Sequence, residues 1–323
     1  MPGYDSFCCF RTANSSQEKR VLWELNNLCN LKCKYCHTMT DEKSDGIPLA
    51  KIKQFYPILK ERQISDIIFS GGEPLLRPDI FDILTSAKEA GFSIDLCTNG
   101  TLIGKKEAGK LKGILSEISI SIDSSATDIH EHFRGMNSHK RVLAGIHNLI
   151  SAGLGVHIIS VVTDESFNYI EETVSLLSGL GVHSITFIGR MSTIRVKSPL
   201  PLTIGQKELR EKILEIRETN STPLNSKRLF FRPSIYKCSA GDSIFGIDAK
   251  GNFLPCILLK RKSFSKNTRA WQKEFAENRN ISCKGCENIY NCSGGCPGAS
   301  CLYDNTIKVD LLCPTAHACR IDR

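Results

Sequence analysis

The stretch that decides the fold is an apolar run followed at once by clustered cysteines: VLWEL at residues 21–25 and then CNLKCKYC at residues 29–36. A short apolar run of this kind is typical of a buried strand. Cys29, Cys33 and Cys36 stand in a Cys-x3-Cys-x2-Cys spacing in the loop that follows. The start of the chain therefore predicts a strand whose end presents three thiols.

Apolar runs and amphipathic stretches alternate from this strand onward, which is typical of repeated βα units. We predict strands at residues 21–25, 67–69, 93–97, 118–122, 156–162 and 184–188, and helices at 49–63, 78–90, 138–152 and 167–178. Six such units predict an α/β fold, an incomplete (β/α)6 parallel barrel. In parallel barrels the chemistry gathers at the carboxyl ends of the strands, so we expect the functional residues there.

Polar residues stand at three of these predicted strand ends. Gly71-Gly72-Glu73-Pro74 ends the second strand, and two glycines let the backbone approach a ligand closely. Asn99 follows the third strand. Ser119, Ser121 and Asp123 alternate along the fourth strand and so share one face, where buried polar groups need polar partners. These residues are candidates for ligand binding or, more simply, for strand-end caps and turns.

A second cysteine array marks the last part of the chain, with Cys-x2-Cys-x5-Cys-x3-Cys spacing at its centre. Its members are Cys238, Cys256, Cys283, Cys286, Cys292, Cys296 and Cys313. The segment is irregular and rich in Gly and Cys, so we expect metal clusters rather than apolar burial to hold it together. We divide the chain into an extension at 1–19, a barrel at 20–195, a connecting region at 196–237 and a small cysteine-rich domain at 238–323. The connecting region contains one predicted helix, near 205–218.

Composition narrows the functional class. We find no apolar run of about 18 residues and no secretory signal, so we expect a cytoplasmic chain without a membrane span. In such a chain of 323 residues, 15 cysteines favour metal binding over disulfides. The formal net charge of +8 is spread along the sequence and does not indicate nucleic-acid binding. We interpret the one dense basic run, at 260–262, as a solvated loop.

The first array together with Gly71-Gly72-Glu73-Pro74 resembles the motifs of the radical S-adenosylmethionine (SAM) enzymes, and the second array resembles the SPASM domain of a subset of them. The resemblance runs from about residue 20 to Cys313. It implies that Cys29, Cys33 and Cys36 hold a 4Fe–4S cluster and that SAM chelates the fourth iron. Reductive cleavage of SAM then gives a 5′-deoxyadenosyl radical that abstracts hydrogen from the substrate, the cofactor supplying the difficult chemistry.

The resemblance also implies roles for residues around SAM. Tyr35 would lie beside the adenine, Glu73 would pair with the methionine ammonium, and Gly71 and Gly72 would let the backbone approach. Ser121 and Asp123 would meet the ribose, Arg134 would reach the carboxylate, and Asn99 would occupy a similar position on the third strand. Cys97 is either a hydrogen donor to a substrate radical or a small buried core residue.

The SPASM resemblance implies two auxiliary 4Fe–4S clusters, three clusters in all. One would use Cys283, Cys286, Cys292 and Cys313, and the other would use Cys238, Cys256 and Cys296. The fourth ligand of the latter stays open between substrate, Cys301 and Cys319. Ile257 stands where sulfatase-maturating relatives carry an aspartate, which makes formylglycine formation a less favoured outcome.

Three functional classes follow from these expectations. The first is modification of a peptide by crosslinking, oxidation or epimerisation; the second is oxidation or epimerisation of a small molecule such as an aminocyclitol or sugar; the third is a non-catalytic cluster module. The two enzymatic classes need an electron donor such as flavodoxin or ferredoxin. Because the predicted barrel begins within about twenty residues of Met1, we expect a peptide substrate to bind directly or through a separate recognition protein.

Overall fold

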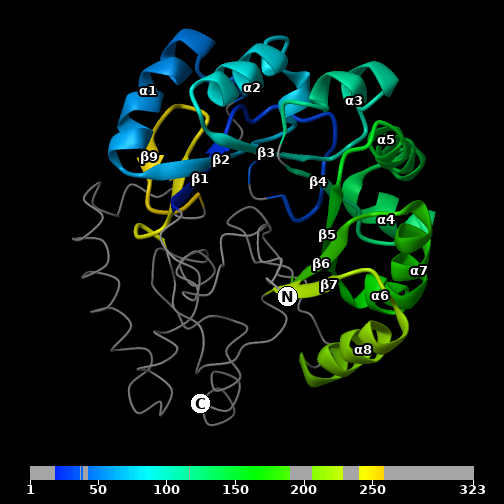
Figure 1. Cartoon of the computed structure of the whole chain (residues 1–323). Helices are drawn as coiled ribbons and strands as arrows, with labels where there is room; N and C mark the ends of the chain where they lie inside the picture. The colour runs from blue at the N-terminus through cyan, green and yellow to red at the C-terminus, as the bar shows by residue number, and fades with distance from the viewer. Residues whose placement is uncertain are drawn as a thin grey trace, which may run out of the picture.

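The computed structural model of the chain describes residues 19–36, 38, 43–115, 117–189, 206–227 and 240–257. In these residues strands and helices alternate along the chain (Figure 1). The elements are β1 Lys19–Glu24, α1 Leu49–Glu61, β2 Ile64–Ser70, the 3-10 turn η1 Pro74–Leu76, α2 Ile80–Glu89, β3 Ser93–Thr98, α3 Lys105–Leu111, β4 Glu117–Ser121, α4 Thr127–Arg134, α5 His139–Ser151, β5 Val156–Val162, α6 Asp164–Phe167, α7 Ile170–Leu180, β6 Ser184–Gly189, α8 Gln206–Thr219, β7 Leu224–Lys227, β8 Ile244–Ile247 and β9 Phe253–Leu254.

One curved sheet organises these elements, with strand order β7-β6-β5-β4-β3-β2-β1-β8-β9. Strands β1 to β7 pair in parallel with their sequence neighbours, β8 pairs in parallel with β1, and only β9 runs antiparallel. Helices α1, α2, α3, α5 and α7 follow one another along the outside of the curve (Figure 1). The predicted α/β fold with a partial parallel barrel is therefore confirmed.

The hydrophobic core lies between the sheet and the outer helices. Alternate strand residues such as Trp23, Phe69 and Leu96 are fully buried in one continuous apolar cluster. The helices add their own apolar stripes to it, for example Val142, Ile146 and Leu149 of α5. Burial of this face, at roughly 25 cal/mol per Å² of apolar surface, holds the helices on the outside and leaves the other sheet face for polar residues.

The inner face of the sheet carries a group of polar residues on β3 to β6, next to apolar residues such as Ile68 on β2, since the side chains of a strand alternate between its two faces. Cys97, Ser119, His157 and Ser184 stand in one register row across β3 to β6. Asp95 and Glu117 pair in the row before it. A polar concave face suits a ligand site better than a packed core.

Most predicted elements agree with the structure within about three residues, and the exceptions have local causes. The helix predicted at 167–178 is two helices, α6 and α7, because the chain turns at Asn168 and Tyr169. The prediction missed α3, α4, β7, β8 and β9. β8 and β9 fall in the segment that we predicted to be irregular, yet β8 extends the barrel sheet beside β1. In the described residues, no helix is both long and apolar enough to cross a membrane.

Candidate functional site

The three cysteines of the first array lie in the loop that follows β1, as predicted. Cys29, Cys33 and Cys36 are free, half-buried thiols. The loop forms a turn in which the Cys36 amide N–H donates to the Cys33 carbonyl over 3.2 Å. The Lys34 N–H donates to the carbonyl of Phe133 over 2.8 Å, which fastens the loop to the last turn of α4. We call residues 29–36 the cysteine loop.

The surroundings of Cys29 and Cys33 raise the pKa of both thiols. Burial raises the pKa of Cys29 and raises that of Cys33 to about 11, and a negative charge on a neighbouring cysteine of the loop adds to each rise. The three sulfur atoms are therefore close enough to influence one another. Metal binding would relieve this unfavourable ionisation, because metals bind thiolates and release the protons.

The arrangement also bears on which kind of metal group fits. In the described part of the chain, no three His, Cys, Asp or Glu side chains are placed to hold a single metal ion. A 4Fe–4S cluster differs from a zinc ion in that it takes its thiolates on separate iron atoms. Three neighbouring thiols from one loop fit a cluster with one iron left open better than they fit a structural zinc site, which needs four convergent ligands.

Gly71 and Gly72 bring the end of β2 against the start of the cysteine loop. The Gly72 N–H donates to the Asn26 carbonyl over 3.0 Å, and the Glu73 N–H donates to the Leu28 carbonyl over 2.7 Å. A Cβ on Gly72 would lie 2.0 Å from the Leu28 oxygen, and Gly71 has φ of +138°, where L side chains are strained. Only glycine fits this close backbone approach.

The Glu73 carboxylate is fully buried beside the loop. Its Oε1 accepts from the Thr98 hydroxyl over 2.7 Å and from the Leu75 N–H over 3.0 Å, and its Oε2 accepts from the Asn99 N–H over 2.8 Å. Burial raises the pKa of Glu73, while the three donors favour the ionised form. Glu73 thus links the ends of β2 and β3, and the predicted pairing with a SAM ammonium would add a cation to this carboxylate.

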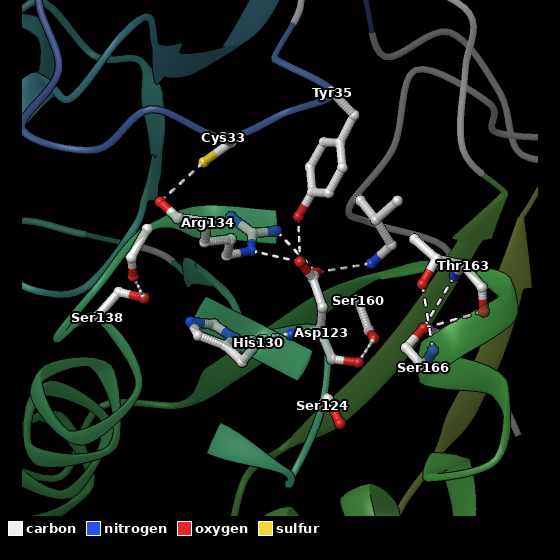
Figure 2. Close-up of polar contacts among 12 residues, drawn as sticks. Cys33, Tyr35, Asp123, Ser124, His130, Arg134, Ser138, Ser160, Thr163 and Ser166 are labelled. Carbon is white, nitrogen blue, oxygen red and sulfur yellow. Dashed lines mark hydrogen bonds and ion pairs between the residues drawn. The ribbon is translucent and has the colours of Figure 1, made fainter. Parts of the chain in front are cut away.

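Asp123, Arg134 and Tyr35 converge on one another (Figure 2). Arg134 donates to both oxygens of Asp123, from Nε over 2.6 Å and from Nη2 over 2.8 Å. The Tyr35 hydroxyl and the Val161 N–H also donate to this carboxylate. The guanidinium of Arg134 lies 5.5 Å from the centre of the Tyr35 ring.

Arg134 keeps the Asp123 carboxylate ionised. Burial alone would raise the pKa of Asp123, but the adjacent guanidinium outweighs burial and the pKa is lowered. Burial lowers the pKa of the neighbouring His130 to about 3, so its neutral ring accepts from the Asp123 N–H over 3.3 Å. Asp123 and Arg134, which we predicted to contact different parts of SAM, are thus brought together as a buried ion pair. Their contacts with SAM stay predictions.

The remaining candidates lie nearby on β3 and β4. Asn99 lies beside the cysteine loop, its amide nitrogen 3.8 Å from Cys29 Sγ. Cys97 is half-buried on the inner face, paired in register with Ser119, and Ser121 is half-buried and paired with Ile159. The predicted roles of Cys97 and Ser121 stay predictions.

Sequence reasoning missed several residues that support the site. Asn26 holds Gly71-Gly72-Glu73 through its side chain, with Nδ2 3.0 Å from the Glu73 carbonyl. Arg77 donates through Nη1 to the carbonyls of Leu25, Asp45 and Ile47. Thr98 and Thr101 flank Asn99 and bond to Glu73 and to Asn99. Of these residues, only Thr98 and Thr101 could have been suspected from the sequence, because they lie close to Asn99 along the chain.

Of the second array, the described residues include only Cys256, which lies half-buried after β9. Cys238, Cys283, Cys286, Cys292, Cys296 and Cys313, and the alternatives Cys301 and Cys319, lie outside the described residues.

Known proteins share both sequence and fold with this chain. Residues 23–177 match the sequence profile of the Radical SAM superfamily. An AdoMet-dependent heme synthase of Methanosarcina barkeri is 32% identical over 176 residues, which cover 52% of this chain and 50% of that protein. The mycofactocin maturase MftC of Mycobacterium tuberculosis is 28% identical over 164 residues, covering 50% and 42%. The chain thus matches about half the length of these relatives or less.

The fold is shared with SuiB of Streptococcus suis. The structure of SuiB bound to S-adenosylmethionine superposes with a TM-score of 0.75 at 18% identity, covering 92% of this chain and 77% of SuiB. SuiB bound to its precursor peptide SuiA superposes with a TM-score of 0.74 at 17% identity, covering 92% and 76%. At these identities the likeness shows the fold. The profile match, the partial barrel and the cysteine loop at the end of β1 agree. Residues 23–177 of this chain form a radical SAM superfamily domain.

Proposed function

We propose that this chain is a radical SAM enzyme that modifies a peptide and carries auxiliary clusters in a SPASM-type domain at 238–323. The observation that carries the catalytic part is the cysteine loop, which presents three thiols after β1. Its Lys34 N–H is held by the Phe133 carbonyl, and Gly72 and Glu73 hold the residues just before it. A structural cluster would not need a fully buried carboxylate such as Glu73 beside it.

The residues divide into those that hold the cluster and those that hold SAM. Cys29, Cys33 and Cys36 would bind the cluster. The proposed SAM contacts are Tyr35, Gly71, Gly72, Glu73, Asn99, Ser121, Asp123 and Arg134. When both groups are bound, the cluster would supply an electron to the sulfonium of SAM, and SAM would supply a 5′-deoxyadenosyl radical that removes hydrogen from the substrate.

The chain itself supplies charge and position. Thr98, Asn99 and Leu75 hold the Glu73 carboxylate in place for a cationic ammonium. Arg134 Nη1 has no hydrogen-bond partner among the described residues, while Nε and Nη2 are held by Asp123. A guanidinium fixed in this way can offer Nη1 to the SAM carboxylate without losing the ion pair, because Arg has five donors in a rigid plane.

Two observations on relatives bear on the substrate. MftC is named a maturase and SuiB has been solved with a precursor peptide, which supports a peptide substrate. The heme synthase shares more identity, 32%, which supports a small molecule of the tetrapyrrole class as the second candidate. We place the peptide first because two similar proteins, MftC by sequence and SuiB by fold, are named with a maturase role or a precursor peptide.

Co-expression tests the peptide proposal. The chain is expressed without oxygen together with each short open reading frame next to its gene, and every peptide is weighed by mass spectrometry. A loss of about two mass units would indicate oxidation or crosslinking, and a gain of about one unit in heavy water would indicate epimerisation. Unmodified peptides together with conversion of an added iron porphyrin or its precursor would overturn the peptide proposal in favour of the second candidate.

The remaining parts of the proposal follow from this chemistry. A cytoplasmic location would keep the clusters reduced, and an electron donor such as flavodoxin or ferredoxin would supply the electron. Cys97, on the inner face of β3, is the candidate hydrogen donor if the product is an epimer.

A further inference from the structure

Asn99 forms a closed ring of hydrogen bonds with Asn30 and Thr101. Asn99 Nδ2 donates to Asn30 Oδ1 over 2.9 Å, and Asn30 Nδ2 donates to the Thr101 hydroxyl over 2.9 Å. The Thr101 hydroxyl donates in turn to Asn99 Oδ1 over 2.6 Å. The ring joins the cysteine loop, which carries Asn30, to the chain that follows β3.

The orientation of the Asn99 amide is fixed by the backbone. The Thr101 N–H donates to Asn99 Oδ1 over 2.9 Å, and a backbone N–H can only donate. The oxygen must therefore face Thr101, and the amide nitrogen must face Asn30 and Cys29. Asn99 Nδ2 carries two protons. One is directed to Asn30, and the other is available to Cys29 Sγ, 3.8 Å away.

Cys29 differs from the other two cysteines in its hydrogen-bond donors. Its sulfur accepts from the Leu31 N–H over 3.4 Å as well as from Asn99. Cys33 Sγ instead faces an acceptor, the Arg134 carbonyl, at 3.9 Å. Cys36 Sγ lies 3.1 Å from the Thr38 hydroxyl, whose proton can point either way. Among the described residues, the Asn99 side chain is thus the one hydrogen-bond donor outside the cysteine loop and its adjoining residues that reaches a sulfur of the loop.

We propose that Asn99 is a positioning residue that raises the reduction potential of the cluster held by Cys29, Cys33 and Cys36. The inference deepens the proposed function and rests on it. An N–H directed at a thiolate sulfur withdraws charge from it and favours the reduced cluster, which carries one more negative charge, and hydrogen bonds to sulfur are among the factors that set cluster potentials. Asn30 and Thr101 act through Asn99 by holding its amide in this orientation.

The test is a redox titration of the full-length chain with its clusters assembled, followed by electron paramagnetic resonance. The SAM-binding cluster is identified in the wild type as the reduced signal that changes when SAM is added, and the same signal is then followed in each variant without SAM, because Asn99 is also a proposed SAM contact. Asn99→Ser keeps an oxygen for the Thr101 N–H, since Ser forms the same local turn as Asn, but is too short to reach Cys29. We expect the midpoint potential of the SAM-responsive signal to fall in this variant.

The matched control is Asn148→Ser. Asn148 Nδ2 donates to the Ile103 carbonyl over 3.0 Å, so it supports the same β3–α3 segment, and no hydrogen bond of its side chain to a cysteine exists in the described residues. Its midpoint potential should equal that of the wild type. An equal fall in both variants would assign the effect to a loosened segment and overturn the inference.

Two further outcomes keep the inference separate from the proposed function. A wild-type chain without any SAM-responsive signal overturns the proposed function and the inference together. A SAM-responsive signal with the same potential in wild type and Asn99→Ser overturns the inference alone. If Asn99→Ser fails to assemble the cluster, Asn99→Asp takes its place, because it keeps the shape and the acceptor for Thr101. An unchanged potential in Asn99→Asp also overturns the inference.

Discussion

Arg134, on the last turn of α4, and Asp123, just beyond β4, form a bidentate ion pair whose side chains are 7% and 1% exposed. The pair holds the cysteine loop through two contacts. Asp123 accepts a hydrogen bond from the Tyr35 hydroxyl, and the Arg134 carbonyl faces Cys33 Sγ (Figure 2). A buried charge that loses its partner is costly, so this relationship makes the site sensitive to either residue.

Replacing Arg134 should therefore destabilise the whole barrel. Arg134→Met leaves the Asp123 carboxylate buried without a counter-charge, and we expect the free energy of unfolding to fall by about 3–5 kcal/mol, measured by urea unfolding without oxygen. The control is Lys212→Met, which breaks the exposed pair between Lys212 and Glu171. That change should cost about 0–1 kcal/mol. Equal losses in the two variants would contradict a structural role for the buried pair.

Tyr35→Phe should loosen the cysteine loop with little effect elsewhere. The change removes the phenol that donates to Asp123 and leaves the ring packed against Phe133. We expect Cys33 and Cys36 of the metal-free protein to react several-fold faster with a thiol reagent, because loop opening becomes easier. Tyr56→Phe removes the buried bond to Ser86 instead, on the outer side of the sheet. Its thiols should react at the wild-type rate, and faster reaction there would show that general destabilisation explains both.

Replacing Gly72 with alanine should disrupt the site, whereas replacing Gly179 with alanine should stabilise the protein. Gly72→Ala puts a Cβ 2.0 Å from the Leu28 carbonyl oxygen, so it must push β2 and the cysteine loop apart and should lose most of the bound iron. Gly179→Ala lies inside α7 with no atom within 4 Å of the new Cβ. It should stabilise the protein by about 0.5–1 kcal/mol, because Ala favours helices over Gly. Full iron content in Gly72→Ala would contradict the close approach.

Asp95 should make stability depend on pH. Burial, helped by Glu117, raises the pKa of Asp95 to about 7. The folded state therefore binds this proton more tightly than the unfolded state, and the stability is present at low pH and lost as pH rises through 7. Relative to Asp95→Asn, the wild type should lose on the order of 2 kcal/mol between pH 5 and pH 8 in urea unfolding. A constant difference between the two proteins across this range would contradict the raised pKa.

The sequence predicted the six barrel strands because their outer faces bury an unbroken apolar pattern, as Trp23 and Phe69 illustrate. It missed α3 and α4 because they are only 7 and 8 residues long, and Thr127–Arg134 offers just Ile129 and Phe133 as apolar residues on its buried side. It missed β8 because the apolar run Ile244–Ile247 is only four residues long and its partner strand, β1, lies more than 200 residues away in the sequence. Local patterns do not contain such long-range pairings.

The candidate site was predictable as a set of positions, and its internal pairing was not. Motif spacing and strand ends were enough to locate Cys29, Glu73 and Asn99. The mutual bond between Asp123 and Arg134 depends on how the turn after β4 brings α4 back over the strand end, which only the folded chain defines. Asn26 and Arg77 were missed because side chains that bond to backbone carbonyls leave no pattern in a sequence.

The most direct test of the account is whether the cysteine loop cleaves SAM. The purified chain, with clusters assembled without oxygen, is reduced with dithionite and incubated with SAM, and 5′-deoxyadenosine is measured by chromatography. We predict that the wild type and Cys9→Ser, which changes a cysteine outside both arrays, form 5′-deoxyadenosine, and that Cys29→Ala, Cys33→Ala and Cys36→Ala form none. A wild-type chain that binds iron but forms no 5′-deoxyadenosine, or a Cys29→Ala chain that still forms it, would contradict the central claim.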